Sequence, residues 1–64
     1  LALAGEFWPA PRGRLVVERR VRERWRHAAT TRTSAGGEYR LALERAGVYR
    51  VRAAGVTGPA VRVR

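Results

Sequence analysis

The sequence predicts an all-β fold, a small sandwich of six to seven short strands in which residues 1–64 make a single domain. Two observations carry this prediction. Apolar and polar residues alternate within short segments, which is the period of a β-strand, and turn-forming residues separate those segments. The expected strands cover residues 1–8, 14–20, 24–33, 38–44, 47–53 and 60–64.

The first two strands follow from local composition. Leucine and alanine alternate in residues 1–4 and lead into Phe7 and Trp8, which is typical of a strand. The β-branched pair Val16 and Val17 opens the second segment. The alternative for the first strand is pairing with the sheet of a neighbouring subunit, which would make the chain self-assembling.

The stretch 15–29 has a second interpretation. Four apolar residues lie at helical spacing, Glu18 and Arg22 are four residues apart, and no glycine or asparagine marks a turn before residue 25. The four apolar residues are Val17, Val21, Trp25 and Ala28. The β-branched start and the threonine-rich end favour strands. A helix near 15–29 in an α+β fold is the alternative, and a small β-barrel is another.

Alternation assigns the side chains of the later strands to two faces, one apolar and one rich in arginine. The expected apolar face carries Tyr39, Leu41, Leu43, Tyr49, Val51, Ala53, Val61 and Val63. In the third strand, the residues expected to share a face are Trp25, His27, Ala29, Thr31 and Thr33. We therefore expect the core to be held by Trp25, Tyr39, Leu41, Tyr49 and Val51.

The segment Ala46-Gly47-Val48-Tyr49-Arg50-Val51 resembles strand F of immunoglobulin-like domains. In that strand a tyrosine corner precedes a core position by two residues, the spacing of Tyr49 and Val51. The resemblance implies that Val51 takes the place of the antibody cysteine. It also implies that Trp25 is the buried tryptophan of strand C and Val17 the strand-B partner. The chain has no cysteine, so the likeness is to the sandwich without its disulfide.

A narrower resemblance extends over most of the chain. It rests on residues 13–20, 25–26, 37–40, 47–52 and 58–63, which read GRLVVERR, WR, GEYR, GVYRVR and GPAVRV. Together they resemble small β-sandwich accessory modules of secreted actinobacterial envelope proteins, most of all the C-terminal modules related to the stage II sporulation D and amidase-enhancer family. The resemblance implies an accessory role beside a parent envelope protein, extracellular or in the cell envelope. It carries over no catalytic residue.

The charged residues are uniform in type. All 14 positive charges are arginine, five glutamates are the only acidic side chains, and the net charge is +9. Arginine, alanine, glycine, proline and valine have GC-rich codons, so codon bias is an alternative source of part of this charge. The chain has no cysteine, and no apolar run reaches the roughly 18 residues that suggest a membrane span.

Catalytic chemistry is not expected. A nucleophilic site needs serine or cysteine, histidine and an orienting carboxylate together, whereas the chain offers Ser34 in a glycine-rich turn and His27 on a strand. The glutamates lie scattered among arginines as charge partners, which does not suggest a glycosidase pair. One histidine without companions forms no metal-ligand pattern. We expect no catalytic residue, no metal site and no cofactor.

Four arginines near the C-terminal end form the candidate ligand site. Neighbouring last strands are expected to place them together, and like charges that face one another across strands destabilise a sheet. An anionic ligand would offset this repulsion, because guanidinium groups form bidentate bonds with phosphate and carboxylate. These residues are Arg50, Arg52, Arg62 and Arg64.

The sequence favours a non-catalytic extracellular structural or adhesive module, either accessory to an envelope protein or self-assembling. The second hypothesis is a module that binds an anionic polymer, nucleic acid or wall polymer, through the four arginines. It ranks second because the aromatic residues alternate with the arginines and are expected to face away from them.

Overall fold

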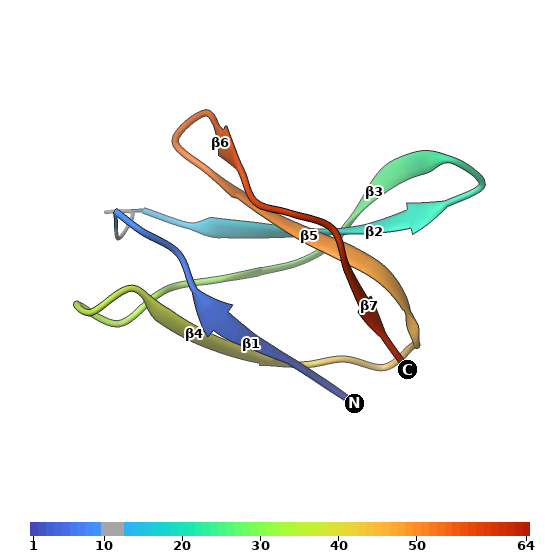
Figure 1. Ribbon diagram of the computed structural model, residues 1–64, viewed down its shortest axis with the longest axis horizontal. Coiled ribbons are helices and arrows are strands. Elements are labelled where there is room, and N and C mark those ends of the chain that lie inside the picture. The colour runs from blue at the N-terminus through green and yellow to red at the C-terminus, as the bar shows by residue number, and fades with distance from the viewer. Residues whose placement is uncertain (10–12) are drawn as a thin grey trace.

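The computed structural model describes residues 1–9 and 13–64 and confirms the all-β fold. The described residues form seven strands and no helix. Figure 1 shows β1 and β4 below β2, β3, β5 and β6, and the strands form two separate sheets, so the chain has two layers rather than a closed barrel. The strands are β1 Ala2–Glu6, β2 Leu15–Val21, β3 Arg24–Thr31, β4 Glu38–Ala42, β5 Gly47–Ala53, β6 Val56–Thr57 and β7 Val61–Val63.

The upper layer is an antiparallel sheet of five strands built around the pair of β2 and β5. β3 pairs with the other side of β2. β6 and β7 follow one another along the opposite edge of β5. Between them, Gly58 donates its amide hydrogen to the carbonyl of Val51 at 2.8 Å and continues the pairing. The lower layer is the antiparallel pair of β1 and β4.

The core lies between the two layers. β2 and β5 contribute most of it, because alternate residues of both strands point toward the small sheet. The buried apolar residues are Leu3, Phe7, Leu15, Val17, Tyr49, Val51 and Ala53. Tyr39 and Leu41 pack against this cluster from β4. The structure thus confirms Tyr49 and Val51 in the core, with Tyr39 and Leu41 as their neighbours.

The prediction that Trp25 belongs to the core is wrong. Trp25 is half-buried and lies on the far side of the large sheet, away from the core. The cause is a β-bulge, since β3 holds one residue more than β2 at this point, Ala28. One extra residue reverses the alternation of side chains. Ala29 therefore packs against the core, whereas Trp25 and His27 face outward.

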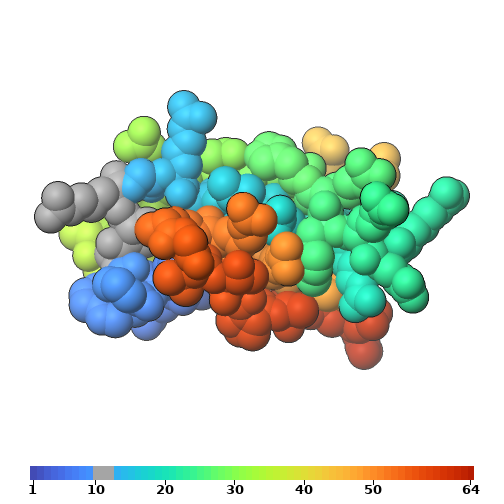
Figure 2. All heavy atoms as spheres, turned by 90° about the horizontal axis from the view of Figure 1, so that it is seen from above, coloured from blue at the N-terminus to red at the C-terminus, as the bar shows by residue number. Residues whose placement is uncertain are grey.

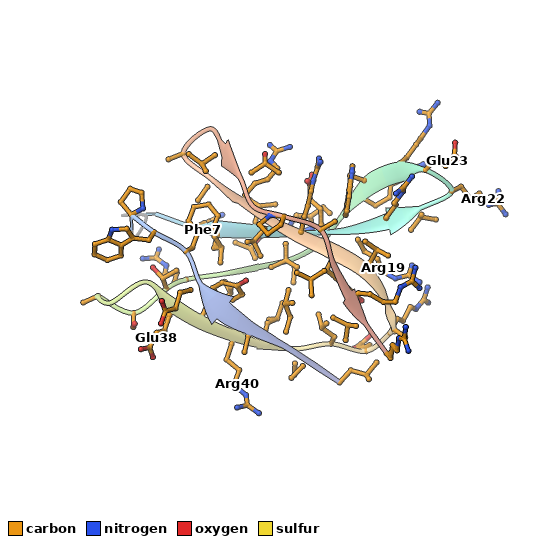
Figure 3. The ribbon with its side chains drawn as sticks, in the orientation of Figure 1. Phe7, Arg19, Arg22, Glu23, Glu38 and Arg40 are labelled. Carbon is orange, nitrogen blue, oxygen red and sulfur yellow. The ribbon has the colours of Figure 1, made fainter. Side chains whose placement is uncertain are left out.

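The alternative of a helix near 15–29 is also wrong, because this stretch forms the hairpin of β2 and β3. The turn consists of Arg22 and Glu23, whose φ angles are 50° and 67°. Two consecutive residues with positive φ make a type I′ turn, whose twist matches that of the flanking strands. Figure 3 shows both side chains pointing away from the end of the hairpin.

The predicted strand segments correspond to observed strands, with one addition. The break expected at 55–59 contains β6, which pairs with the end of β5 across a turn at Ala54 and Gly55. The strands expected at 1–8, 24–33, 38–44 and 60–64 are shorter in the structure. Of the break expected at 9–13, residues 10–12 lie outside the described residues.

Tyr49 makes a hydrogen bond of the kind that a tyrosine corner makes. The Tyr49 hydroxyl donates a hydrogen bond to the carbonyl of Arg45 at 2.6 Å, and Val51 is buried two residues later. The implied partners of this strand are wrong. β2 pairs directly with β5, so Val17 is the neighbour of Val51 within one sheet rather than its partner across the sandwich. Trp25 lies on β3, which is one strand further from β5 than β2 is.

Candidate functional site

The outer face of the five-stranded sheet gathers four arginines around one glutamate and one tryptophan. Every second side chain of its strands points to this side, away from the small sheet. Figure 2 looks onto this side from above and shows β3, β2, β5 and β6 next to one another. We call this surface the cationic face and define it as Glu18, Arg20, Trp25, Arg50, Arg52 and Arg62.

Strand register brings these residues together from distant parts of the sequence. Glu18 of β2 lies opposite Arg50 of β5, so the two side chains are neighbours on the same face. Arg20 lies opposite Trp25 across the hairpin of β2 and β3. The bulge at Ala28 turns Trp25 to this side, and without it the ring would point toward the core.

Glu18 holds two of the arginines. Its Oε1 atom accepts a hydrogen bond from Arg50 Nε at 2.8 Å, and its Oε2 atom lies 3.4 Å from Arg52 Nη1. The side chains of Glu18 and Arg50 are only 13% and 24% exposed, so water screens this pair less than a fully exposed one. Arg52 is 50% exposed and keeps part of its guanidinium group open to solvent.

Trp25 contacts Arg50 as well. The guanidinium carbon of Arg50 lies 4.3 Å from the centroid of the Trp25 ring, within the range of a cation–π interaction. Arg50 contacts both Glu18 and Trp25, so its guanidinium group is held in place in the middle of the cationic face. The side chains that remain open to a ligand are those of Arg20, Arg52 and Arg62, all of them exposed.

The structure places three of the four arginines predicted as a ligand site on one face. Arg50 and Arg52 alternate with buried residues of β5, and Arg62 lies opposite Val48, which points to the same side. Arg64 is exposed and follows Val63, the last paired residue of β7. No pairing in the described residues brings Arg64 to the others. Their binding of a ligand stays a prediction.

The prediction that these arginines face one another across strands is wrong. Arg62 lies opposite Val48, and Arg52 lies between Val16 on one side and Thr57 on the other. The reason is that β6 and β7 divide the edge of β5 between them, so Arg52 and Arg62 lie at opposite ends of the sheet. The positive charge is therefore spread over the face, and the fold does not depend on a bound anion to separate facing arginines.

No protein-family model, curated protein or solved structure matches the chain. The chemistry of the cationic face is therefore inferred from its own residues, and the resemblance to envelope accessory modules stays a prediction. Exposed guanidinium groups on a rigid sheet bind phosphate or carboxylate through paired N–H donors. Several of them on one surface suit a polymer that presents anions at repeated intervals.

Sequence reasoning missed three members of this face, Glu18, Arg20 and Trp25. Glu18 and Arg20 carry a usable signal, since both alternate with the inward-facing Val17 of β2. Trp25 carries none, because the bulge that turns it outward leaves no mark in the sequence around it. One aromatic ring thus lies among the arginines, whereas Tyr39 and Tyr49 face the core, away from them, as expected.

His27 and Ser34, the side chains considered for catalysis, form hydrogen bonds in different parts of the structure. His27 Nε2 shares a hydrogen bond with the hydroxyl of Thr30 at 2.9 Å on β3. Ser34 Oγ accepts a hydrogen bond from the amide of Glu38 at 3.3 Å in the turn before β4. In the part of the chain that the structure describes, no three side chains of the metal-binding types lie together. The same residues include no helix that is long and apolar enough to cross a membrane.

Proposed function

We propose that the chain is a non-catalytic adhesive module that binds phosphate-bearing polymers through the cationic face. The observation that carries the proposal is the set of three exposed arginine side chains on one side of the five-stranded sheet, those of Arg20, Arg52 and Arg62. A polymer with phosphates at regular intervals contacts several of them at once, so that individually weak bonds reinforce one another.

The supporting residues of the face suit this role. Four arginines and one glutamate leave it with a formal charge of +3, as 4 − 1. Glu18 also limits the conformations of Arg52, to which it is bonded, so less conformational entropy is lost when that side chain binds a phosphate. The face therefore combines net positive charge with partial preorganisation.

Two kinds of polymer present the same repeated anion, a wall polymer with a phosphate backbone and a single-stranded nucleic acid. Trp25 is the aromatic residue on this face, and Arg50 covers one side of its ring. Base stacking needs an open ring, so this arrangement favours recognition of the backbone. We accordingly take the wall polymer as the ligand, which agrees with the accessory role at the cell envelope that the sequence resemblance implies.

The test compares two triple variants with the same change in charge. The first removes the exposed charges of the cationic face and consists of Arg20→Gln, Arg52→Gln and Arg62→Gln. The control removes three exposed arginines that point away from this face. It consists of Arg24→Gln, Arg26→Gln and Arg40→Gln.

Binding to a glycerol-phosphate polymer and to labelled single-stranded DNA is measured by fluorescence anisotropy over a range of salt concentrations. Each neutralised phosphate contributes about 0.7 to the slope of log K against log salt, so the first triple variant is expected to reduce the slope by about 2. The control is expected to keep the wild-type slope. Equal losses in both variants would mean that binding follows net charge alone, and would overturn the assignment to this face.

A further inference from the structure

A second charged site lies on the inner side of the five-stranded sheet, the side that faces the small sheet. It is a cleft of about 480 Å³ between β2 and β3 on one side and the loop from β4 to β5 on the other. A cleft of this volume accommodates a small ligand. We call it the inner cleft and define it by its charged residues, Arg19, Arg26, Glu44 and Arg45.

Two arginines of the inner cleft face each other across neighbouring strands. Arg19 of β2 lies directly opposite Arg26 of β3. Arg19 also lies opposite the buried Tyr49 of β5, so this row of side chains points to the inner side of the sheet. The Cα atoms of directly opposite residues lie about 4.5 to 5.5 Å apart, so both guanidinium groups can reach one ligand. Like charges at this separation repel, and a bound anion would relieve the repulsion.

Arg19 is held in position by the loop between β4 and β5. Its Nε and Nη2 atoms donate hydrogen bonds to the carbonyl of Ala46 at 3.3 and 3.2 Å. The side chain lies against Gly47, where a Cβ atom would come within 2.8 Å of Arg19 Nε. Figure 3 shows Arg19 at the end of the molecule where β5 begins. The bonds to Ala46 leave the other N–H groups of this guanidinium for a ligand.

The inner cleft has a net positive charge. Its three arginines and Glu44 give a formal charge of +2, as 3 − 1. Both ion pairs found among the described residues involve Glu18, so Glu44 forms none with the arginines of the cleft. Glu44 is therefore the acidic side chain that an anionic ligand meets there. The remaining glutamates are Glu6 and Glu38 at the far end of the small sheet, Glu18 on the cationic face and Glu23 in the hairpin turn.

A pair of facing arginines suits a doubly charged head group. Each guanidinium group can form paired hydrogen bonds with the oxygens of a phosphate. A phosphate monoester carries a charge of about −1.5 to −2 at pH 7, more than the single charge of a phosphodiester or a carboxylate. Val21 and Leu43 line the same cleft and offer apolar contacts to the organic group of such a ligand.

We propose that the inner cleft is a binding site for a small organic phosphate monoester, separate from the cationic face. Arg19 and Arg26 bind the phosphate, and exposed Arg45 adds positive charge from the loop. The side chains of Arg20, Arg52 and Arg62 lie on the opposite side of the same sheet, so the inner cleft and the cationic face can be tested independently.

The first test compares ligands by isothermal titration calorimetry. Phenyl phosphate is expected to bind about tenfold or more tightly than methyl phenyl phosphate or benzoate, which carry one charge, and than inorganic phosphate, which has no apolar group. Equal binding of methyl phenyl phosphate or benzoate overturns the doubly charged ligand. Equal binding of inorganic phosphate overturns the contact with an organic group, and no binding of phenyl phosphate at millimolar concentration overturns the site.

Two variants of β3 locate the binding site. Arg26→Gln removes a charge from the inner cleft, whereas Arg24→Gln removes one on the same side of β3 but outside the cleft. Both side chains are exposed, so folding is expected to persist. Arg26→Gln is expected to weaken binding of phenyl phosphate about tenfold, and Arg24→Gln less than about twofold. Equal weakening by both variants would mean that net charge alone attracts the ligand, and would overturn the site.

Charge reversal separates loss of the site from loss of the fold. Arg26→Glu places a carboxylate opposite Arg19, so binding of phenyl phosphate is expected to be lost while the urea midpoint of unfolding rises. Glu44→Gln makes the opposite change in charge and is expected to strengthen binding about twofold or more. Binding that persists in Arg26→Glu, or that does not strengthen in Glu44→Gln, overturns the assignment of these residues.

The cationic face provides the last control. The triple variant Arg20→Gln, Arg52→Gln and Arg62→Gln is expected to bind phenyl phosphate within about twofold of the wild type at about 0.15 M salt, where the Debye length is about 8 Å. A loss of about tenfold or more in this variant, with Arg26→Gln unchanged, would assign the ligand to the cationic face and overturn the proposal.

Discussion

Tyr49 joins the core to the loop between β4 and β5. Its side chain is 2% exposed, and its hydroxyl donates a hydrogen bond to the carbonyl of Arg45 at 2.6 Å. The next carbonyl, that of Ala46, accepts a hydrogen bond from the guanidinium group of Arg19 at 3.2 Å. Side chains of β5 and β2 thus satisfy consecutive carbonyls of the loop, and a partly buried carbonyl is costly to leave unpaired.

The variant Tyr49→Phe keeps the ring and removes this hydrogen bond. We expect the free energy of unfolding to fall by about 1 kcal/mol, because the Arg45 carbonyl loses its partner. Urea denaturation followed by tryptophan fluorescence measures the change. Tyr39→Phe is the matched control, because it removes the hydroxyl of another partly desolvated tyrosine. This variant is expected to change the free energy of unfolding by less than about 0.5 kcal/mol. Equal losses in both variants would contradict the role of the corner.

Alternation predicts the orientation of single residues only where a strand is regular. It identifies Tyr49 and Val51 as inward-facing because β5 alternates without interruption. It fails for Trp25 because the extra residue in β3 exchanges the two faces, and no residue type marks that bulge in the sequence. It also could not pair Arg50 with Glu18, which is 32 residues away and reaches it only through the order of the strands.

The hairpin of β2 and β3 is an element whose turn chemistry differs from the usual pattern. A type I′ turn needs positive φ at both central positions, which favours asparagine and glycine. Here Arg22 and Glu23 occupy these positions, so both carry the steric cost of the left-handed region. This is why the sequence leaves a helix near 15–29 open as an alternative. The pairing of two long strands outweighs the unfavourable turn.

Replacing Glu23 with glycine tests this explanation of the hairpin. We expect Glu23→Gly to raise the free energy of unfolding by about 0.5 to 1 kcal/mol, because relief of the strained φ exceeds the added backbone entropy of the unfolded chain. Glu44→Gly is the control, since it makes the same change in charge at an exposed residue without positive φ. It is expected to lower stability slightly in the same urea titrations. Destabilisation by both variants would show that the turn is unstrained.

Strand segments can be predicted from this sequence, whereas strand partners cannot. The segment of β5 stands out because apolar residues and arginines alternate in it, and the segment of β2 stands out because it opens with the β-branched pair Val16 and Val17. Their pairing depends on how both strands bury apolar side chains against β1 and β4, which are far away in the chain. The position of β6 depends on the same long-range contacts, because a two-residue strand has no period of its own.

At the scale of the whole molecule, charge opposes folding. The net charge is +9, and Glu18 forms both ion pairs found among the described residues. The longest extent of the molecule is 32 Å. At an ionic strength of about 0.01 M the Debye length is about 30 Å, so each arginine is repelled by nearly all the others, whereas at about 0.15 M it is about 8 Å. Such self-repulsion destabilises the compact state.

We expect the free energy of unfolding to rise as sodium chloride increases from about 0.01 M to about 0.15 M, because screening relieves repulsion more in the compact state than in the expanded chain. Urea denaturation at each salt concentration measures this. For the triple variant Arg24→Gln, Arg26→Gln and Arg40→Gln, the free energy of unfolding is expected to rise less over the same range of salt. A fall in stability with salt would mean that the attraction of Glu18 for its arginines outweighs the repulsion. Polymer binding is expected to weaken over the same range of salt through counterion release. Stability and polymer binding should thus change in opposite directions with salt, which separates the charge that opposes folding from the charge that binds the polymer.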